Sequence, residues 1–231
     1  MIDLYFAATP NGYKLALFLE EAGLAYEIIP VNISHGDQYR PEYLVISPNN
    51  KIPAMLDFDP VDGGAPIALF ESGAMLLYLA EKTGRFMPTD LRGRLEVLKW
   101  LFWQVGGLGP MAGQNGHFSV YATEKIPYAM DRYVQETSRL YGVLNEQLRD
   151  REFIAGDYSI ADMACYPWIV PHQLHGQNLD HFPRLKRWFR TIAARPATIK
   201  VYGEDQDWFA ARTASSVSDE ARKAVFGRTA R

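Results

Sequence analysis

The chain has 231 residues, 48% of them apolar and 13% aromatic, so it can bury one large core or two smaller ones. No run of about 18 apolar residues occurs, which argues against a membrane-spanning helix. The net charge of −3, with no block of Lys and Arg, argues against nucleic acid as a partner, and the single cysteine, Cys165, excludes an internal disulfide framework.

Residues 2–6 form an apolar run that predicts a short buried strand, and no basic segment precedes it. We therefore expect no secretory signal peptide and a cytoplasmic protein. A helix is predicted over 12–23, with Asn11 as its N-cap and Gly23 as its stop. A second strand is predicted at 26–31, so the chain opens with a β-α-β unit whose strands are parallel.

A short helical turn is predicted at 41–46, and Pro53 then stands directly before an apolar strand at 54–56. A proline at a strand entry has no amide proton to donate, and X-Pro bonds are the common cis peptide bonds. The Pro/Gly/Asp segment 59–66 predicts a turn that joins this strand to another at 67–70, as a β-hairpin.

Ser72 is the candidate N-cap of a helix that reaches about residue 83. The predicted order over 1–83 is therefore β-α-β-α-β-β-α, and the Gly- and Pro-containing segment 84–92 is the predicted linker. Residues 1–83 carry 11 acids and 4 bases, whereas 84–231 carry 16 acids and 20 bases. This asymmetry indicates two units with different surfaces.

The segment after the linker, 93–196, is predicted to be an all-helical unit. One helix begins after Ser159, whose side chain can form a capping box with Asp162. Residues 197–231 are polar and without clear periodicity, so a partly ordered tail is expected. The other helices are predicted at 94–111, 124–148 and 183–194.

A β-α-β-α-β-β-α unit followed by an all-helical unit resembles the cytosolic glutathione transferases, which join a thioredoxin-like domain to a helical one. Four motifs occur in the order of that family: "TPNG", "NNKIPA", "ESGAMLLYLAEK" and "SIADMACYPW". The resemblance covers about residues 1–196. Within the family the chain most resembles the nu class, the bacterial disulfide-bond oxidoreductase type, through "LFWQVGGLGPMAGQN" and "IPYAMDRY" among other segments.

The resemblance implies a thiol site at the first turn. Thr9 takes the position of the reactive Cys of thioredoxin-like proteins and brings no redox group. Glutathione is then implied as the source of the thiol, with the Thr9 hydroxyl and the Asn11 amide donating to its thiolate beside a helix N-terminus. These donors raise the fraction of thiolate, the form that attacks. The alternative is that both residues serve only the turn and the cap.

The resemblance also implies how the rest of glutathione is held. Glu71 is expected to take its ammonium group and Ser72 its γ-glutamyl carboxylate, at a helix N-terminus that favours an anion. The backbone of Ile52, turned outward by a cis Pro53, is expected to pair with the cysteinyl backbone, beside Lys51.

Three further residues match family positions near the ends of the bound peptide: Gln38, Arg40 and Arg132. An arginine suits a carboxylate because its planar fork can bind both oxygens. Ordinary exposed charges are the alternative for Arg40 and Arg132. Tyr128 and Trp103 are candidates for the substrate cleft, although aromatic residues at helical spacing are more often part of the core.

Three functions fit these residues. A glutathione-dependent disulfide reductase is favoured, in which a bound thiolate attacks a disulfide and a second glutathione resolves the mixed disulfide, so that no protein Cys is needed. Conjugation of glutathione to an electrophile and a non-enzymatic glutathione-binding regulatory module are the alternatives. No metal is expected, because His172 and His175 lack a third ligand. The resemblance implies a homodimer.

Overall fold

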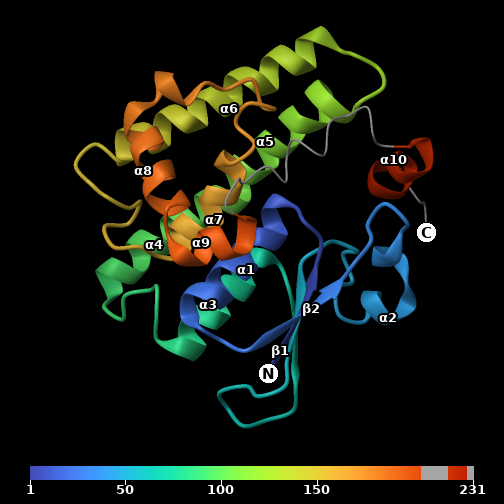
Figure 1. The fold of residues 1–231 in the computed structure, drawn as a ribbon, viewed down its shortest axis with the longest axis vertical. Coiled ribbons are helices and arrows are strands. Elements are labelled where there is room, and N and C mark those ends of the chain that lie inside the picture. The colour runs from blue at the N-terminus through green and yellow to red at the C-terminus, as the bar shows by residue number, and fades with distance from the viewer. Residues whose placement is uncertain (204–217, 228–231) are drawn as a thin grey trace.

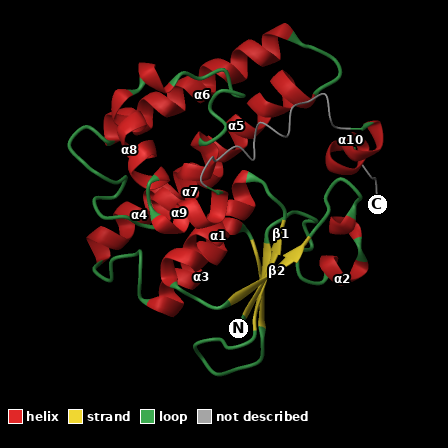
Figure 2. Cartoon of the chain, in the orientation of Figure 1, coloured by secondary structure: helices red, strands yellow, loops and turns green. Residues whose placement is uncertain are grey.

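The computed structural model describes residues 1–203 and 218–227 (Figure 1). A four-stranded sheet forms the first unit together with helices that cover it, and the second unit is helical (Figure 2). This confirms the predicted fold class, a thioredoxin-like unit followed by an all-helical one. The elements of the first unit are β1 (Ile2–Phe6), α1 (Pro10–Ala22), β2 (Tyr26–Pro30), η1 (Asp37–Tyr39), α2 (Pro41–Leu44), β3 (Ala54–Asp57), β4 (Ile67–Phe70) and α3 (Ser72–Thr83).

The sheet has the order β2-β1-β3-β4. Strand β1 pairs in parallel with β2 and antiparallel with β3, and β3 pairs antiparallel with β4 as the predicted hairpin. Leu4 on β1 lies opposite Met55 on β3, and both side chains are fully buried. Helices α1 and α3 cover one face of the sheet, while Tyr43 of α2 packs with Val31 and Ala54 on the other (Figure 2).

Helix α1 begins two residues earlier than predicted, and its N-cap is Thr9 rather than Asn11. Thr9 Oγ1 accepts a hydrogen bond from the Gly12 amide at 3.3 Å. Pro10 suits the first helical position because the amide there needs no partner within the helix. The predicted stop is confirmed, since Gly23 ends the helix in the left-handed conformation.

The N-cap of α3 is also one residue earlier than predicted, at Glu71 rather than Ser72. Glu71 has φ 72°, a conformation that strains any residue other than glycine and that is concentrated at functional sites. Ser72 therefore becomes the first helical residue, and the Glu71 side chain makes no capping hydrogen bond.

The helical unit differs from prediction at several boundaries. Asp90 caps a helix that begins inside the predicted linker, and that helix continues through a π-helical segment into the next one. The predicted helix start at residue 124 is wrong, because Pro127 takes the first helical position. The elements are α4 (Leu91–Trp103), η2 (Gln104–Leu108), α5 (Gly109–Gly116), η3 (His117–Tyr121), α6 (Pro127–Gln147), α7 (Ile160–Ile169), η4 (Leu179–His181), α8 (Pro183–Ala193), α9 (Pro196–Tyr202) and α10 (Asp219–Phe226).

Two helices, α9 and α10, lie in the expected tail. The sequence did not predict them, because the segment is polar and lacks clear periodicity. Its other residues, 204–217 and 228–231, lie outside the described part of the chain. The predicted capping box at Ser159 and Asp162 is confirmed. One hydrophobic core runs from the sheet through α1 and α3 into α7 and α8, so the two units are packed together as one body.

Candidate active site

A cavity of about 1200 Å³ lies between the two units. The beginnings of α1 and α3 form one side of it, and α5, α7 and the end of α10 form the other. A smaller pocket of about 140 Å³ adjoins it beside Pro53. Six residues predicted for glutathione line one or both of these pockets: Asn11, Lys51, Ile52, Pro53, Glu71 and Ser72.

Thr9 precedes the cavity wall and does not line either pocket. Its hydroxyl oxygen accepts from the Gly12 amide, which leaves the hydroxyl proton to be donated elsewhere. Gly12 is required by the tight turn, since a Cβ there would lie 2.4 Å from the Ala7 carbonyl oxygen. The close packing of Gly12 against Ala7 thus fixes the backbone that carries the Thr9 hydroxyl and the Gly12 amide.

Asn11 occupies the first turn of α1 and lines both pockets. Its Oδ1 accepts a hydrogen bond from Trp168 Nε1 at 3.1 Å. The indole nitrogen can only donate, so this bond identifies the carbonyl end of the amide. The NH2 end of Asn11 is the end left to serve a ligand. Together with the N-terminal end of α1, it forms an environment that favours a negative charge.

The start of α3 forms a second anion-favouring position. Ser72 is 8% exposed and lines both pockets, and Glu71 beside it is exposed to the same cavity. Ser72 Oγ accepts from Lys14 Nζ at 3.2 Å, and Lys14 Nζ also donates to Gln104 Oε1 at 2.6 Å. Burial lowers the pKa of Lys14 to about 7, partly opposed by the negative charge of Glu71.

The Ile52–Pro53 peptide bond is cis, as the sequence suggested. The loop before it is fixed by two hydroxyl groups, because Tyr43 and Ser47 both donate to the Lys51 carbonyl, at 2.7 and 2.8 Å. Ile52 therefore enters β3 from a rigid turn that borders the smaller pocket.

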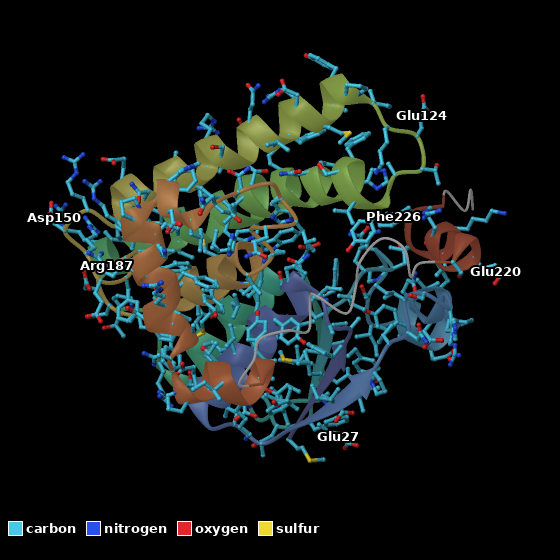
Figure 3. The ribbon with its side chains drawn as sticks, turned by 45° about the horizontal axis from the view of Figure 1, so that its top comes forward. Glu27, Glu124, Asp150, Arg187, Glu220 and Phe226 are labelled. Atoms are coloured by element: carbon cyan, nitrogen blue, oxygen red, sulfur yellow. The ribbon has the colours of Figure 1, made fainter. Side chains whose placement is uncertain are left out.

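The end of helix α10 lines the cavity, although the helix lies in the expected tail. Figure 1 shows α10 beside the first unit, near α2. Gln38 Nε2 and the Tyr39 hydroxyl both donate to the Ala224 carbonyl, at 3.1 and 3.2 Å. Phe226, labelled in Figure 3, packs edge-on against His117 with ring centroids 5.0 Å apart. The helix therefore joins η1 of the first unit to η3 of the second.

The structure does not bring every predicted residue to the cavity. Gln38 is buried behind the wall, where its amide binds Ala224 and Ile33, and Tyr39 lines the cavity in its place. Arg40 is exposed and pairs with Asp37 at 2.7 Å.

The three predicted residues of the helical unit also lie outside the cavity lining. Arg132, with its side chain 57% exposed, pairs with Glu136 at 3.7 Å. Tyr128 is 80% exposed. Trp103 is half-buried and packs against Trp100 with ring centroids 5.2 Å apart.

Cys165 is fully buried on α7, and burial raises the pKa of its thiol well above the usual value. This burial confirms the prediction of a buried thiol. Cys165 also lies outside the lining of both pockets. Among residues 1–203 and 218–227, no group of three or more His, Cys, Asp or Glu side chains could hold a metal ion. Over the same ranges, no helix has the length and apolar character needed to cross a membrane.

Sequence reasoning missed Lys14, Gln104, Trp168 and Phe226. The Lys14 position carried a usable signal, because it is three residues after Asn11 and so falls on the same helix face. A lysine inside an otherwise apolar helix also indicates a polar partner, because lysine is rarely buried without one. The other three residues come from distant segments of the chain: Gln104, Trp168 and Phe226. Their spacing in the sequence does not predict that they line one cavity.

Comparison with known proteins agrees with this architecture. The family model for the glutathione S-transferase N-terminal domain matches residues 9–82, and the model for the C-terminal domain matches 112–196. The chain is 57% identical over 199 residues to the disulfide-bond oxidoreductase YfcG of Escherichia coli, covering 86% of this chain and 93% of the relative. It is 41% identical over 210 residues to the disulfide-bond oxidoreductase YghU of the same organism, covering 85% and 72%.

Solved structures give the same result. A glutathione transferase family member from Pseudomonas fluorescens, described with two glutathione bound, is 45% identical with a TM-score of 0.82, covering 87% of this chain and 91% of that one. A glutathione transferase from Pseudomonas putida, described with one glutathione disulfide per subunit, is 42% identical with the same TM-score, covering 87% and 90%. This chain belongs to the glutathione S-transferase family, as its sequence motifs predicted.

Proposed function

We propose that this enzyme is a glutathione-dependent disulfide reductase. The observation that carries the proposal is the Asn11 amide, held by Trp168 at the positive end of α1 in a cavity without a protein thiol in its lining. A site that stabilises a sulfur anion but brings no sulfur needs a thiol from a ligand. The relatives named as disulfide-bond oxidoreductases support disulfides as the substrates.

Glutathione is a substrate in this scheme. Two glutathione thiols and one disulfide R–S–S–R give one oxidised glutathione and two thiols R–SH, so two electrons pass to the substrate. Asn11 and the N-terminal end of α1 stabilise the thiolate, the helix end by about 0.3–1 kcal/mol. The Thr9 hydroxyl, already fixed by the Gly12 amide, is the second proposed donor.

The other predicted residues have proposed roles in holding the tripeptide. Glu71 binds its ammonium group, Ser72 binds the γ-glutamyl carboxylate, and the Ile52 backbone pairs with the cysteinyl residue before the cis Pro53. Lys51, which lines both pockets, is proposed to attract a second carboxylate.

Gln38 is proposed to act indirectly, by holding α10 across the cavity through Ala224. Three residues are exposed: Arg40, Arg132 and Tyr128. We propose that the two arginines reach glutathione, and Tyr128 the disulfide substrate, only after their side chains move. Trp103 is proposed to support the cleft from behind, because it packs on Trp100.

The size of the cavity supports a reaction between two bound molecules. Small-molecule pockets usually measure about 300–1,000 Å³, whereas this one measures about 1200 Å³. The Pseudomonas fluorescens relative is described with two glutathione bound, which supports the same arrangement here.

We also propose that the protein is a cytoplasmic homodimer. Exposed apolar side chains support a partner surface, among them Phe102, Leu95 and Leu91 on α4. The opposite net charges of residues 1–83 and 84–231 fit pairing of the first unit with the second unit of a partner. Light scattering coupled to size-exclusion chromatography measures the mass; a monomer at micromolar concentration contradicts the proposal.

The proposed function is tested with purified protein and reduced glutathione. Turnover of hydroxyethyl disulfide without turnover of a chloro-nitrobenzene is the expected result. The reverse result contradicts reductase function and supports conjugation. Binding of glutathione with neither activity contradicts both and supports a binding module.

A further inference from the structure

Lys14 is a buried cation beside the proposed glutathione site. It lines the cavity, yet it is only 1% exposed. Its ammonium group donates to Ser72 Oγ and Gln104 Oε1, which are both neutral. Within the described residues, no carboxylate forms an ion pair with it. A buried charge without a counter-ion is unfavourable, so a ligand that carries the opposite charge would stabilise the charged form of Lys14.

The surroundings of Lys14 contain few other charges. Glu71 at the start of α3 acts on it electrostatically, Cys165 on α7 lies near it, and His117 on η3 lines the same cavity. The raised pKa of Cys165 keeps its thiol neutral near pH 7. The charged residue of α9, Lys200, lies against the far end of α1, where it pairs with Glu20. Lys51 also lines this cavity, so an anion bound next to Lys14 would meet two cations, Lys14 and Lys51, and the exposed Glu71.

The two acceptors of Lys14 are arranged to receive such an anion. Because Ser72 Oγ accepts from the ammonium group, the Ser72 hydroxyl proton is left for another acceptor. Gln104 turns Oε1 toward Lys14, and its buried Nε2 has no hydrogen-bond partner in the described part of the chain. The amides at the start of α3 favour negative charge at the same place. A hydroxyl donor, an amide donor and a cation thus share one wall of the cavity.

We propose that Lys14 is the positioning residue that makes this end of the site select a carboxylate, with Ser72 as the direct donor. The inference rests on the proposed function, in which the γ-glutamyl carboxylate of glutathione binds at Ser72. Lys14 orients the Ser72 hydroxyl toward the ligand and supplies the positive charge. Glu71 holds the neighbouring ammonium group, so the two ends of the α-amino acid are distinguished by opposite charges.

The test compares two ligands by isothermal titration calorimetry. One is S-methylglutathione, whose sulfur cannot ionise, and the other carries a 4-aminobutanoyl group in place of γ-glutamyl and so lacks only this carboxylate. Lys14→Met is expected to weaken binding of the first by about tenfold or more, because the nearby positive charge and the hydrogen bond that orients the Ser72 hydroxyl are lost. Binding of the second should change by less than about twofold. An equal loss for both ligands, or no loss for either, overturns the inference.

The dependence of binding on pH gives a second readout. A carboxylate next to Lys14 favours its charged form and raises its pKa above the value of about 7 in the unliganded protein. The favourable interaction is therefore fully present below pH 7 and is lost as the pH rises through the raised value. Wild-type affinity for S-methylglutathione should fall more steeply between about pH 6.5 and pH 8.5 than that of Lys14→Met. Parallel profiles overturn the inference.

The controls separate this inference from the proposed function. Lys99→Met removes an exposed lysine that pairs with Glu96 outside the cavity, and it should bind both ligands like the wild type. Thermal melting checks the fold, and Lys14→Gln replaces Lys14→Met if the latter does not fold. A wild-type protein that binds neither ligand overturns the proposed function together with the inference. Wild-type binding without preference for the carboxylate overturns the inference alone.

Discussion

Trp168 Nε1 donates a hydrogen bond to Asn11 Oδ1 at 3.1 Å, and this bond joins α7 of the helical unit to the first turn of α1. The donor-only indole fixes which end of the Asn11 amide points toward α7. The NH2 end is then left for a ligand in the cavity. The helical unit thereby orients a side chain of the first unit on which the proposed chemistry depends.

Replacing Trp168 with Phe should test this link directly. The ring packing is largely kept, but the Asn11 amide loses the donor that orients it, so we expect kcat/KM for hydroxyethyl disulfide to fall by about threefold to tenfold. Trp100→Phe is the matched control, because its indole donates to Glu96 outside the cavity. Equal activities of the two variants would show that the hydrogen bond does not matter.

Asn11→Ala should lower disulfide turnover by about tenfold or more while the protein stays folded, since one donor to the thiolate is removed. Asn11→Asp should lower it further, because a carboxylate repels the thiolate. Titration of bound glutathione, followed by the ultraviolet absorbance of the thiolate, should show a higher thiol pKa in both variants. An unchanged rate would remove Asn11 from the mechanism.

Cys165→Ala should keep disulfide turnover within about twofold of the wild type, because a buried thiol with a raised pKa is not a nucleophile. Iodoacetamide should likewise fail to inactivate the folded wild-type enzyme. The rate assay with glutathione and hydroxyethyl disulfide measures both effects. Loss of turnover in a folded Cys165→Ala protein would contradict glutathione as the only source of thiol.

Phe226→Ala should raise KM for the disulfide substrate by about threefold to tenfold. The ring is 40% exposed and packs against His117 in the cavity lining, so its removal widens the cavity and loses about 1 kcal/mol of apolar contact. Lys223→Ala on the same helix is the control, since Lys223 is exposed and does not line the cavity. If both variants keep the wild-type KM, α10 has no part in substrate binding.

Asp162→Ala should destabilise the whole protein. The buried carboxylate accepts from the Ile154 and Ser159 amides, the Ser159 hydroxyl and Trp188 Nε1, and its removal leaves these donors unpaired. We expect the free energy of unfolding in urea to fall by about 3 kcal/mol or more. Asp90→Ala, at the exposed N-cap of α4, should cost only about 1 kcal/mol. Similar losses would contradict this account of Asp162.

Much of this protein could be read from local patterns. The alternation of apolar runs with Pro and Gly turns placed all four strands, and Pro53 before a strand indicated the cis bond. The pair Ser159 and Asp162 marked a helix start because a capping box involves only neighbouring residues. Such features depend on contacts within a few positions of the chain.

Other features were decided only by the tertiary structure. Gln104 and Trp168 reach Lys14 and Asn11 from helices about 90 and 157 positions away, and a sequence period cannot report a contact between separate elements. Arg40 and Arg132 are exposed and form ion pairs with Asp37 and Glu136, which the sequence did not predict. The sequence by itself therefore determined the fold and the order of its elements, because local hydrogen bonding and apolar periodicity specify them. Which polar side chains share one cavity was decided only when the helical unit packed against α1 and buried Lys14.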